Sequence, residues 1–397
     1  MESAKKKWAP NPYSIAQLLV DDLDVDTLFD ADGKSVDQKL RDALRVEDKQ
    51  RSATEVFQLF QQITQLVERP TTLAAVMALE PVKKAIEIFG VNQLQRLLPY
   101  LVPLADALFL ASDSTPGQSS APGWFKDSGA LLIDDASYLD PIQGAVGDCY
   151  LVSVMIALAW SKPEFWSARL TSSGFNPPSQ SAFQWQFHGE EDAATVNVKV
   201  TGRVPVAGKN TPRYARAASG ESWPGLIEKA CVMKARPAGA AGNEPSPADY
   251  QAIDRGATPP RACQMLVGGN VRGKLLDTRA GAKIFSTEGD LHTATGIMKQ
   301  PVMAWTKEDI GVTDPQVWEK TGLWPNHAYA VLGTMTSDHV VLRNPHGVAT
   351  EIRAGYAEGP WRPDGRDAVP LNQKGVFAIS PEVFFKHFDN IGWVELD

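Results

Sequence analysis

The sequence has few of the features that mark secreted, membrane-spanning and nucleic-acid-binding proteins. It contains 3 cysteines in 397 residues, too few for a disulfide scaffold and odd in number, so at least one thiol should be free. The first eight residues are polar and lack the apolar stretch of a secretory signal. No run approaches the roughly 20 apolar residues that a membrane helix needs. We therefore expect no membrane association and a cytoplasmic, reducing setting, with export by a route without a signal left open.

Basic residues are also scarce relative to acidic ones. Lys and Arg total 39 against 47 Asp and Glu, which gives a formal net charge of −8. Binding to nucleic acid depends on concentrated Lys and Arg that neutralise phosphates. The charge balance therefore argues against nucleic acid as a partner.

Apolar spacing and composition divide the chain into two parts. Residues from about 14 to 110 place apolar side chains at three- and four-residue intervals and have almost no glycine, which predicts an all-α N-terminal domain over residues 1–110. Residues 111–123 are small, polar and rich in Pro and Gly, as in a linker. Beyond them, the continuously apolar helix-length segment 149–160 is followed by alternating, strand-like segments such as 183–187. An α+β core is therefore expected over residues 124–397.

The segment around Cys149 carries the strongest chemical signal. A turn that contains Gly144 and Gly147 leads to Cys149 at the start of the apolar helix. A helix N-terminus presents unpaired N–H groups and partial positive charge, which favour a reactive thiolate. Gln143 precedes the cysteine by six residues, so its amide can return across the turn and join the Cys149 N–H in binding an oxyanion. A buried structural cysteine is the alternative for Cys149 alone, and the surrounding Gln, Gly and Asp residues favour the nucleophile.

A cysteine nucleophile needs an imidazole base and a group that fixes the tautomer of that ring. Among the six histidines, His327 directly precedes the strand-like run 328–332, which is a rigid mount for a base. Asn344 follows 17 residues later, after the strand-like run 340–342. Two strands joined by the intervening turn would bring His327 and Asn344 side by side. The Asn carbonyl can then accept from one ring nitrogen while the other ring nitrogen faces the thiol.

These three segments resemble the active-site blocks of the calpain family, which belongs to the papain-like cysteine proteases. Residues 143–151 (Gln-Gly-Ala-Val-Gly-Asp-Cys-Tyr-Leu) resemble the family's nucleophile signature, in which the Gln serves the oxyanion hole. Residues 324–333 resemble the block that supplies the base. Residues 343–347 (Arg-Asn-Pro-His-Gly) resemble the Arg-Asn-Pro-Trp-Gly block that supplies the Asn. The order Cys, His, Asn is the papain-like order.

The resemblance spans about residues 124–397 and implies the architecture of this core. It is that of a two-lobed papain-like protease, with a mainly helical Cys lobe over about 124–260 and a strand-rich His/Asn lobe over about 261–397. Gly268 and Gly269 fall where the family has a paired glycine that lines the substrate cleft. Bare backbone there would let an extended peptide hydrogen-bond like an added strand.

Two residues depart from the family pattern, and calcium is an open question. Tyr150 replaces one Trp with another large aromatic residue. His346 replaces the Trp that shields the His–Asn hydrogen bond, so a weaker pair or a different pH dependence is expected. His346 is also a rival base, disfavoured because Pro345 directs the chain out of strand register. Asp140 is one candidate calcium ligand, but residues 348–355 lack the dense carboxylates of a calcium loop, so we expect neither a metal nor another cofactor.

The sequence therefore predicts a cysteine endopeptidase that hydrolyses peptide bonds in protein or peptide substrates. Cys149, His327 and Asn344 form the expected triad, and Gln143 the expected oxyanion donor. Two alternatives stay open: a catalytically silent calpain-like binding module, and an amidase or acyl-transfer enzyme with the same triad. The N-terminal helical domain is expected to bind a partner or the protease core.

Overall fold

The structure is a computed structural model, and it describes the chain from residue 125 onward, with gaps. The predicted all-α domain (1–110) and the predicted linker (111–123) lie outside the described residues. The described ranges are 125–127, 130–133, 135–171, 182–189, 194–207, 211–217, 219–237, 244–254, 257–275, 291–307, 321–324, 326–336, 338–347, 353, 355–363 and 365–396.

The chain divides into two compact units. Among the described residues, those between 127 and 204 and between 214 and 396 belong to one unit, and residues 125–126, 205–207 and 211–213 belong to the other. Three short strands, β1 (Phe125–Asp127), β5 (Arg203–Ala207) and β6 (Thr211–Pro212), form a small sheet in the order β1-β5-β6.

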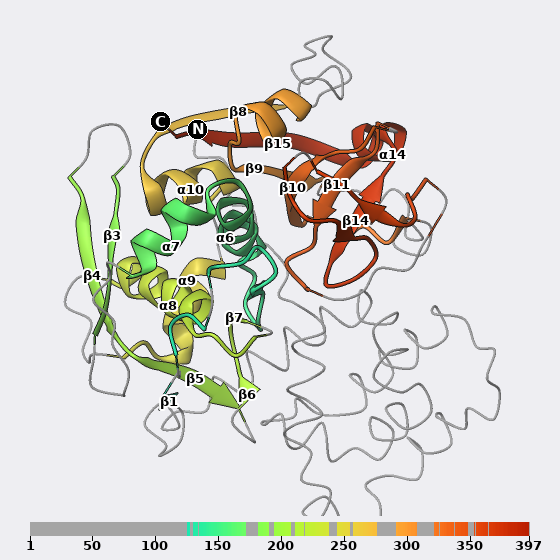
Figure 1. The fold of residues 1–397 in the computed structure, drawn as a ribbon. Coiled ribbons are helices and arrows are strands. Elements are labelled where there is room, and N and C mark those ends of the chain that lie inside the picture. Colours follow the sequence, from blue (N-terminus) through green and yellow to red (C-terminus); the bar gives the residue numbers. More distant parts are fainter. Residues whose placement is uncertain are drawn as a thin grey trace, which may run out of the picture. The chain divides into compact units, whose positions relative to one another are not determined.

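The first unit contains one helix that is apolar on every side. All 13 residues of α6 (Cys149–Ser161) are buried, as expected for a helix with no polar face. Figure 1 places α6 among the other helices of this part, next to the strands of the large sheet. Those helices are α7 (Pro163–Thr171), α8 (Trp223–Ala235), α9 (Pro247–Asp254) and α10 (Pro259–Val267), accompanied by the antiparallel strand pairs β2 (Pro141–Ile142) with β7 (Arg216–Ala217) and β3 (Ala182–Phe187) with β4 (Val196–Thr201).

A six-stranded sheet follows α10 in the chain. Its order is β14-β11-β10-β9-β15-β8, and all five neighbouring pairs are antiparallel. The strands are β8 (Asn270–Leu275), β9 (Val302–Thr306), β10 (Ala328–Thr334), β11 (Val340–Arg343), β14 (Val376–Ile379) and β15 (Phe388–Glu395). A π-helical turn η3 (Thr293–Ile297), helix α14 (Pro381–His387) and the short pair β12 (Pro360–Trp361) with β13 (Val369–Pro370) complete this part. The predicted mixture of helices and strands is confirmed.

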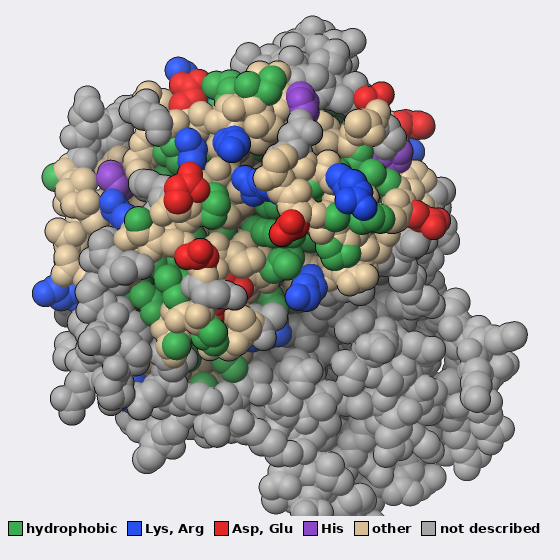
Figure 2. Space-filling view, in the orientation of Figure 1, with side chains coloured by type: hydrophobic (Ala, Val, Ile, Leu, Met, Phe, Trp, Pro, Cys, Tyr) green, Lys and Arg blue, Asp and Glu red, His purple; other side chains and the backbone are tan. Residues whose placement is uncertain are grey.

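The surface of the described residues mixes both signs of charge. Figure 2 shows Lys and Arg side chains interspersed with Asp and Glu on one face of the molecule. On that face the described basic side chains form no continuous basic surface. No helix in the described part of the chain is long and apolar enough to cross a membrane.

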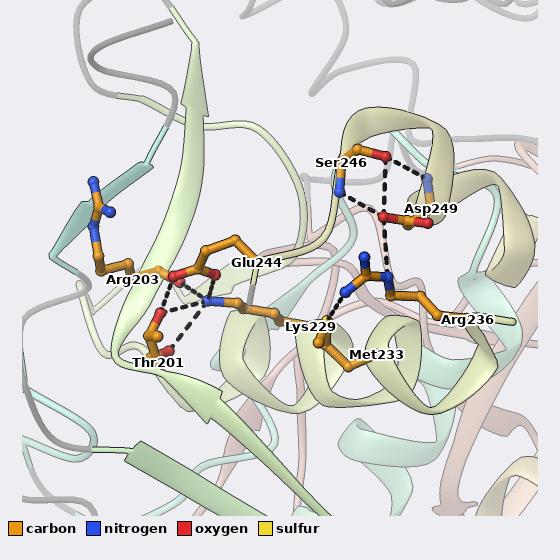
Figure 3. Close-up of polar contacts among 8 residues, drawn as sticks. All are labelled: Thr201, Arg203, Lys229, Met233, Arg236, Glu244, Ser246 and Asp249. Carbon is orange, nitrogen blue, oxygen red and sulfur yellow. Dashed lines mark hydrogen bonds and ion pairs between the residues drawn. The ribbon is translucent and has the colours of Figure 1, made fainter. Parts of the chain in front are cut away.

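Helix α8 is fixed to β4 by a buried lysine. Lys229 Nζ donates to the carbonyl oxygens of Thr201 (3.2 Å) and Arg203 (2.8 Å), and to Thr201 Oγ1 (2.9 Å). It also forms an ion pair with Glu244, as Figure 3 shows. Burial lowers the pKa of Lys229 to about 8, and the Glu244 carboxylate opposes that shift. The lysine can stay charged inside the protein because these acceptors replace water.

The end of α8 is also joined to the start of α9. Ser246 and Asp249 exchange hydrogen bonds in a reciprocal cap: the Ser246 N–H donates to Asp249 Oδ2 (2.7 Å), and the Asp249 N–H donates to Ser246 Oγ (3.3 Å). Arg236 Nε lies 3.3 Å from the same Asp249 oxygen (Figure 3). The two helices are therefore held in a defined relation to each other.

Arg343 connects the large sheet to the segment that precedes Cys149. This residue ends β11, and its side chain is completely buried. Its guanidinium donates to the carbonyl oxygens of Pro141 (2.9 Å), Leu139 (2.8 Å) and Lys374 (3.2 Å). Burial lowers the pKa of Arg343 to about 10, so the group remains charged at neutral pH. The Arg343 side chain therefore joins β11 to two segments that are distant from each other in sequence, one at residues 139–141 and one at residue 374.

We expect Arg343→Met to lower the free energy of unfolding by about 3 kcal/mol, because it leaves three carbonyl groups without these donors. Arg343→Lys keeps the charge but loses the fork of donors, so it should fall between Met and the parent. Urea unfolding measures both. Arg272→Met is a matched control, since Arg272 pairs with Glu395 at the surface (3.0 Å), and its effect should be far smaller. Equal changes in the free energy of unfolding at positions 343 and 272 would show that the hydrogen bonds of Arg343 do not stabilise the fold as expected.

Candidate active site

The turn before α6 is shaped by backbone contacts. The Asp148 N–H donates to the Val146 carbonyl (2.9 Å), and the Asp148 carbonyl accepts from the N–H groups of Leu151 (2.7 Å) and Val152 (3.1 Å). A Cβ at Gly144 would lie 2.2 Å from the Tyr214 backbone, so only glycine fits there. This turn makes Cys149 the first residue of the helix, where backbone N–H groups have no partner within the helix.

The structure brings the Cys149 sulfur next to the residue that follows His327. The Ala328 N–H donates to Cys149 Sγ at 3.4 Å, and Ala328 is the first residue of β10. Both Cys149 (0% exposed) and His327 (1% exposed) are buried. All three cysteines of the chain are free thiols.

His327 and Asn344 meet because β10 and β11 are antiparallel neighbours, paired with Ala330 opposite Arg343. His327 Nε2 and Asn344 Oδ1 lie 2.9 Å apart. The His346 N–H also donates to Asn344 Oδ1, at 2.9 Å. A backbone N–H can only donate, so this bond identifies the oxygen end of the Asn344 amide. The His327 ring must then carry its proton on Nε2, which leaves the lone pair on Nδ1.

A threonine that sequence reasoning missed fixes the backbone of His327. Thr306 ends β9, and its Oγ1 accepts from the His327 N–H (3.0 Å) and donates to the Trp324 carbonyl (2.6 Å). The Thr306 N–H donates in turn to the His327 carbonyl (3.0 Å). Nothing in the sequence marked Thr306, because its role depends on the pairing of β9 with β10. Burial lowers the pKa of His327 to about 4, against an opposing effect of the Asn344 hydrogen bond.

His346 occupies the position where the family has Trp, and its ring packs on His327. The two ring centroids are 4.3 Å apart at an angle of 42°, and Trp324 contacts His346 edge-on at 5.2 Å. Burial, with a further contribution from His327, lowers the pKa of His346 well below its usual range. The two histidines differ in how they bind Asn344 Oδ1: His327 uses a ring nitrogen, whereas His346 uses its backbone N–H. This difference favours His327 over His346 as the oriented base.

Gln143 is fully buried in the turn that leads to the cysteine. Its backbone N–H donates to the Pro345 carbonyl (2.9 Å), which lies in the Asn344 block. Its side chain returns across the turn, and Nε2 donates to the Val146 carbonyl (2.8 Å). An amide NH₂ group has two hydrogens, and this bond uses one of them.

Gly268 and Gly269 have local reasons to be glycine. Their φ angles are +81° and +83°, a region that other residues rarely adopt. Gly268 caps α10 through its N–H bond to the Gln264 carbonyl (2.8 Å). A Cβ at Gly269 would lie 2.5 Å from the Glu395 carbonyl oxygen. The role of both glycines in substrate binding stays a prediction.

The residues around Asp140 do not form a ready site for calcium. Asp140 Oδ2 accepts from the Ser137 N–H (2.7 Å) and from Trp223 Nε1 (3.2 Å). The nearby Glu221 accepts from the Ile133 N–H and from Ser219 Oγ. Calcium needs six to eight oxygen ligands, whereas these carboxylate oxygens already serve N–H and O–H donors. In the described part of the chain, no three His, Cys, Asp or Glu residues form a group that could hold a metal ion.

Comparison with known proteins identifies the family. A family model described as "Calpain family cysteine protease" matches residues 120–395. The chain belongs to the calpain family. The family resemblance of the three short sequence blocks is thereby confirmed.

Several curated relatives are calpains or thiol proteases. Calpain clp-1 of Caenorhabditis elegans is 23% identical over 321 residues, which cover 72% of this chain and 37% of the worm protein. Calpain-5 of Mus musculus is 27% identical over 317 residues, 70% of this chain and 44% of the mouse protein. A thiol protease of Porphyromonas gingivalis is 26% identical over 299 residues, 68% of this chain and 52% of the bacterial protein. This calpain-family chain therefore spans about half the length of these relatives, or less.

We expect His346→Phe to make the protein less sensitive to acid. The folded state binds a proton at His346 less readily than the unfolded state, whose pKa is near 6.5, so this imidazole lowers stability as pH falls below that value. Phenylalanine fills the same position without titrating. Urea unfolding at pH 7.5 and pH 5.5 should give a drop in the free energy of unfolding that is about 1 kcal/mol smaller in the variant. His292→Gln, at an exposed histidine, should match the parent. An unchanged drop in His346→Phe would show that the buried imidazole titrates normally.

Proposed function

We propose that this calpain-family chain is an active cysteine endopeptidase that hydrolyses peptide bonds through Cys149, His327 and Asn344. One observation carries the proposal. Asn344 Oδ1 accepts a hydrogen bond from the His346 N–H and one from His327 Nε2. The ring proton of His327 therefore lies on Nε2, and Nδ1 carries a lone pair. The next residue in the chain, Ala328, donates its N–H to the Cys149 sulfur.

The chemistry follows from that arrangement. His327 Nδ1 takes the thiol proton, and the Cys149 thiolate attacks the carbonyl carbon of the scissile peptide bond. The imidazolium then gives its proton to the leaving amine, and the C–N bond breaks to leave a thioester on Cys149. Water, deprotonated by the same imidazole, hydrolyses the thioester and restores the thiol. Asn344 keeps the ring in one tautomer throughout.

Two donors are assigned to the oxyanion that forms in each step. The first is the Cys149 backbone N–H, which belongs to the first turn of α6 and benefits from the helix dipole. The second is the Gln143 amide. Its bond to the Val146 carbonyl orients the amide within the turn before Cys149, and an N–H of this amide is assigned to the oxyanion.

The finer organisation belongs to the same proposal. A helical Cys lobe and a strand-rich His/Asn lobe would form the two walls of a substrate cleft, with Gly268 and Gly269 along its non-primed side. The buried state of Cys149 means that a protein substrate must displace whatever covers the sulfur before attack. We further propose a cytoplasmic location, with three free thiols as support, and a partner-binding or core-binding role for residues 1–110.

We expect Cys149→Ala to abolish cleavage of an unfolded protein substrate, with a loss of about 10³-fold or more. Cys231→Ala is the matched control, because Cys231 is also buried and carries no assigned role. Asn344→Ala should lower kcat strongly and shift the pH profile, because the ring loses its tautomer lock. Cleavage by Cys149→Ala at the parent rate would overturn the nucleophile. A folded parent that cleaves no substrate would instead favour the catalytically silent binding module. The burial of Cys149 is compatible with that alternative.

Calcium is expected to leave the activity of the parent unchanged, because the carboxylates of Asp140 and Glu221 already bind protein donors. The measurement compares cleavage rates in millimolar calcium, in millimolar magnesium and in excess chelator. A rise of more than about tenfold that only calcium produces would contradict the expectation and would point to ligands contributed by a rearranged site.

A further inference from the structure

A cavity of about 560 Å³ lies at the opposite end of α6 from Cys149. Its walls include Trp160, near the end of α6, and residues 332–334, which end β10. Cys149 begins α6 and Ala328 begins β10, so the cavity lies at the far ends of the two elements that meet at the proposed active site. No residue of the proposed triad is among its described lining residues. Its volume is in the usual range of ligand pockets, about 300–1,000 Å³.

Two indole rings form a fixed wall of this cavity. Trp160 Nε1 donates to the Leu332 carbonyl (2.6 Å). Trp361 Nε1 donates to the Thr334 carbonyl (3.2 Å), so both indoles are attached to β10. A Cβ at Gly333 would lie 2.7 Å from the Trp361 ring, so a larger residue there would displace that indole. The two ring centroids are 5.4 Å apart, which means that the rings pack on each other and leave no space for a planar base between them.

The charged side chains of the lining are mainly basic. Lys299, Arg362 and Arg366 line the cavity with one carboxylate, Asp338, so three positive charges against one negative leave a formal charge of +2 with His292 neutral. The chain as a whole carries −8, so positive charge is concentrated here. In the described part of the chain, neither Lys299 nor Arg362 forms an ion pair, and both side chains are exposed. The lining therefore attracts an anionic ligand.

Arg366 is held in place by an aromatic ring. Its guanidinium carbon lies 4.0 Å from the centroid of the Trp160 ring, a cation–π contact. Glu164 of α7, which is not among the described lining residues, also attracts Arg366. An arginine that is fixed in this way loses less conformational freedom on binding an anion than a mobile surface arginine does.

Two exposed apolar side chains lie beside the basic lining. Ile297 and Met298 are 70% and 47% exposed, and they occupy the two positions between the lining residues Gly296 and Lys299. Ile297 ends η3, and π-helical turns are rare and frequent at functional sites. An occupant that also covers these two side chains extends beyond the cavity, as a peptide segment does and a free nucleotide or phosphate does not.

We propose that this cavity is a binding site for an acidic peptide segment of a partner protein. Carboxylates of the segment pair with Lys299, Arg362 and Arg366, and an apolar side chain next to them covers Ile297 and Met298. Opposite charge provides the recognition, and the fixed indoles provide a surface that needs no rearrangement. The inference goes beyond the proposed function and does not depend on it, since the site lies at the other ends of α6 and β10.

A segment bound in this cavity leaves the proposed active site open. Trp160 follows Cys149 by eleven residues on one helix, which corresponds to a rise of about 16 Å. The occupant therefore does not cover the sulfur, and a substrate and an acidic segment can be bound at the same time.

The test measures the fluorescence anisotropy of a fluorescein-labelled peptide, Glu-Asp-Leu-Glu-Asp-Phe-Glu-Asp, in the presence of the full chain. The chain carries Cys149→Ala, so that the probe is not cleaved. We expect saturable binding that weakens as salt is raised, because exposed charges are screened. Lys299→Glu and Arg362→Glu should each raise the Kd about tenfold, because each places a like charge against the segment. Lys199→Glu, at an exposed lysine of β4 outside the cavity, makes the same change in net charge and should leave the Kd within about twofold.

A second pair of variants tests the apolar part of the site. Ile297→Ser should raise the Kd about threefold, because the segment no longer buries this side chain. Val196→Ser is the matched control, since Val196 is also an exposed apolar residue (48%) and does not line the cavity, so its Kd should equal that of the parent.

Competition identifies the class of ligand. The unlabelled acidic peptide should displace the probe, whereas ATP and inorganic phosphate at the same concentration should not, nor should a peptide with Lys in place of every Glu and Asp. Absence of saturable binding, equal effects of Lys299→Glu and Lys199→Glu, or displacement by ATP or phosphate as effective as by the peptide would overturn the proposal. Binding as expected by a chain whose parent cleaves no substrate would support this site and contradict only the proposed function.

Discussion

The structure depends on the complete burial of one apolar helix. Because α6 has no polar face, it can lie only inside the protein, and both of its ends need partners from other elements. At its start, the Ala328 N–H reaches the Cys149 sulfur; near its end, Trp160 Nε1 donates to the Leu332 carbonyl (2.6 Å). Eleven residues of helix rise about 16 Å, and the four-residue step along β10 covers about 13 Å, so the helix lies along the strand. This packing brings Cys149, the proposed nucleophile, next to the strand that follows His327.

Lys229 and Arg343 are fully buried basic side chains whose contacts replace the water that a charged group would otherwise bind. Lys229 and Arg343 both satisfy their charge with backbone carbonyl groups, and Lys229 with a carboxylate as well. Each of these two side chains joins different elements: Lys229 joins α8 to β4, and Arg343 joins β11 to the segment before Cys149.

Much of the site could be predicted from the sequence because its signals are local. The Gly-containing turn before an apolar run identified Cys149, and strand-like runs around His327 and Asn344 identified their pairing. The helix-length and alternating patterns beyond residue 124 correspond to α6 and to strands in the structure. Thr306 and the carbonyl partners of Arg343 could not be predicted, since each contact joins residues far apart in sequence that carry no periodic pattern. Gly268 and Gly269 were noted for substrate binding, whereas their contacts give a conformational reason for both.

The bonds of Arg343 all end on main-chain oxygens, a group that every amino acid possesses. Leu139 and Lys374 can thus be exchanged for other residues during evolution while the acceptors stay where they are. The donor does not tolerate such exchange, because one substitution of Arg343 removes all three hydrogen bonds. Substitutions are therefore tolerated at the positions that supply the carbonyl groups and opposed at position 343. The segments around residues 139 and 374 can change in sequence and still stay attached to the sheet.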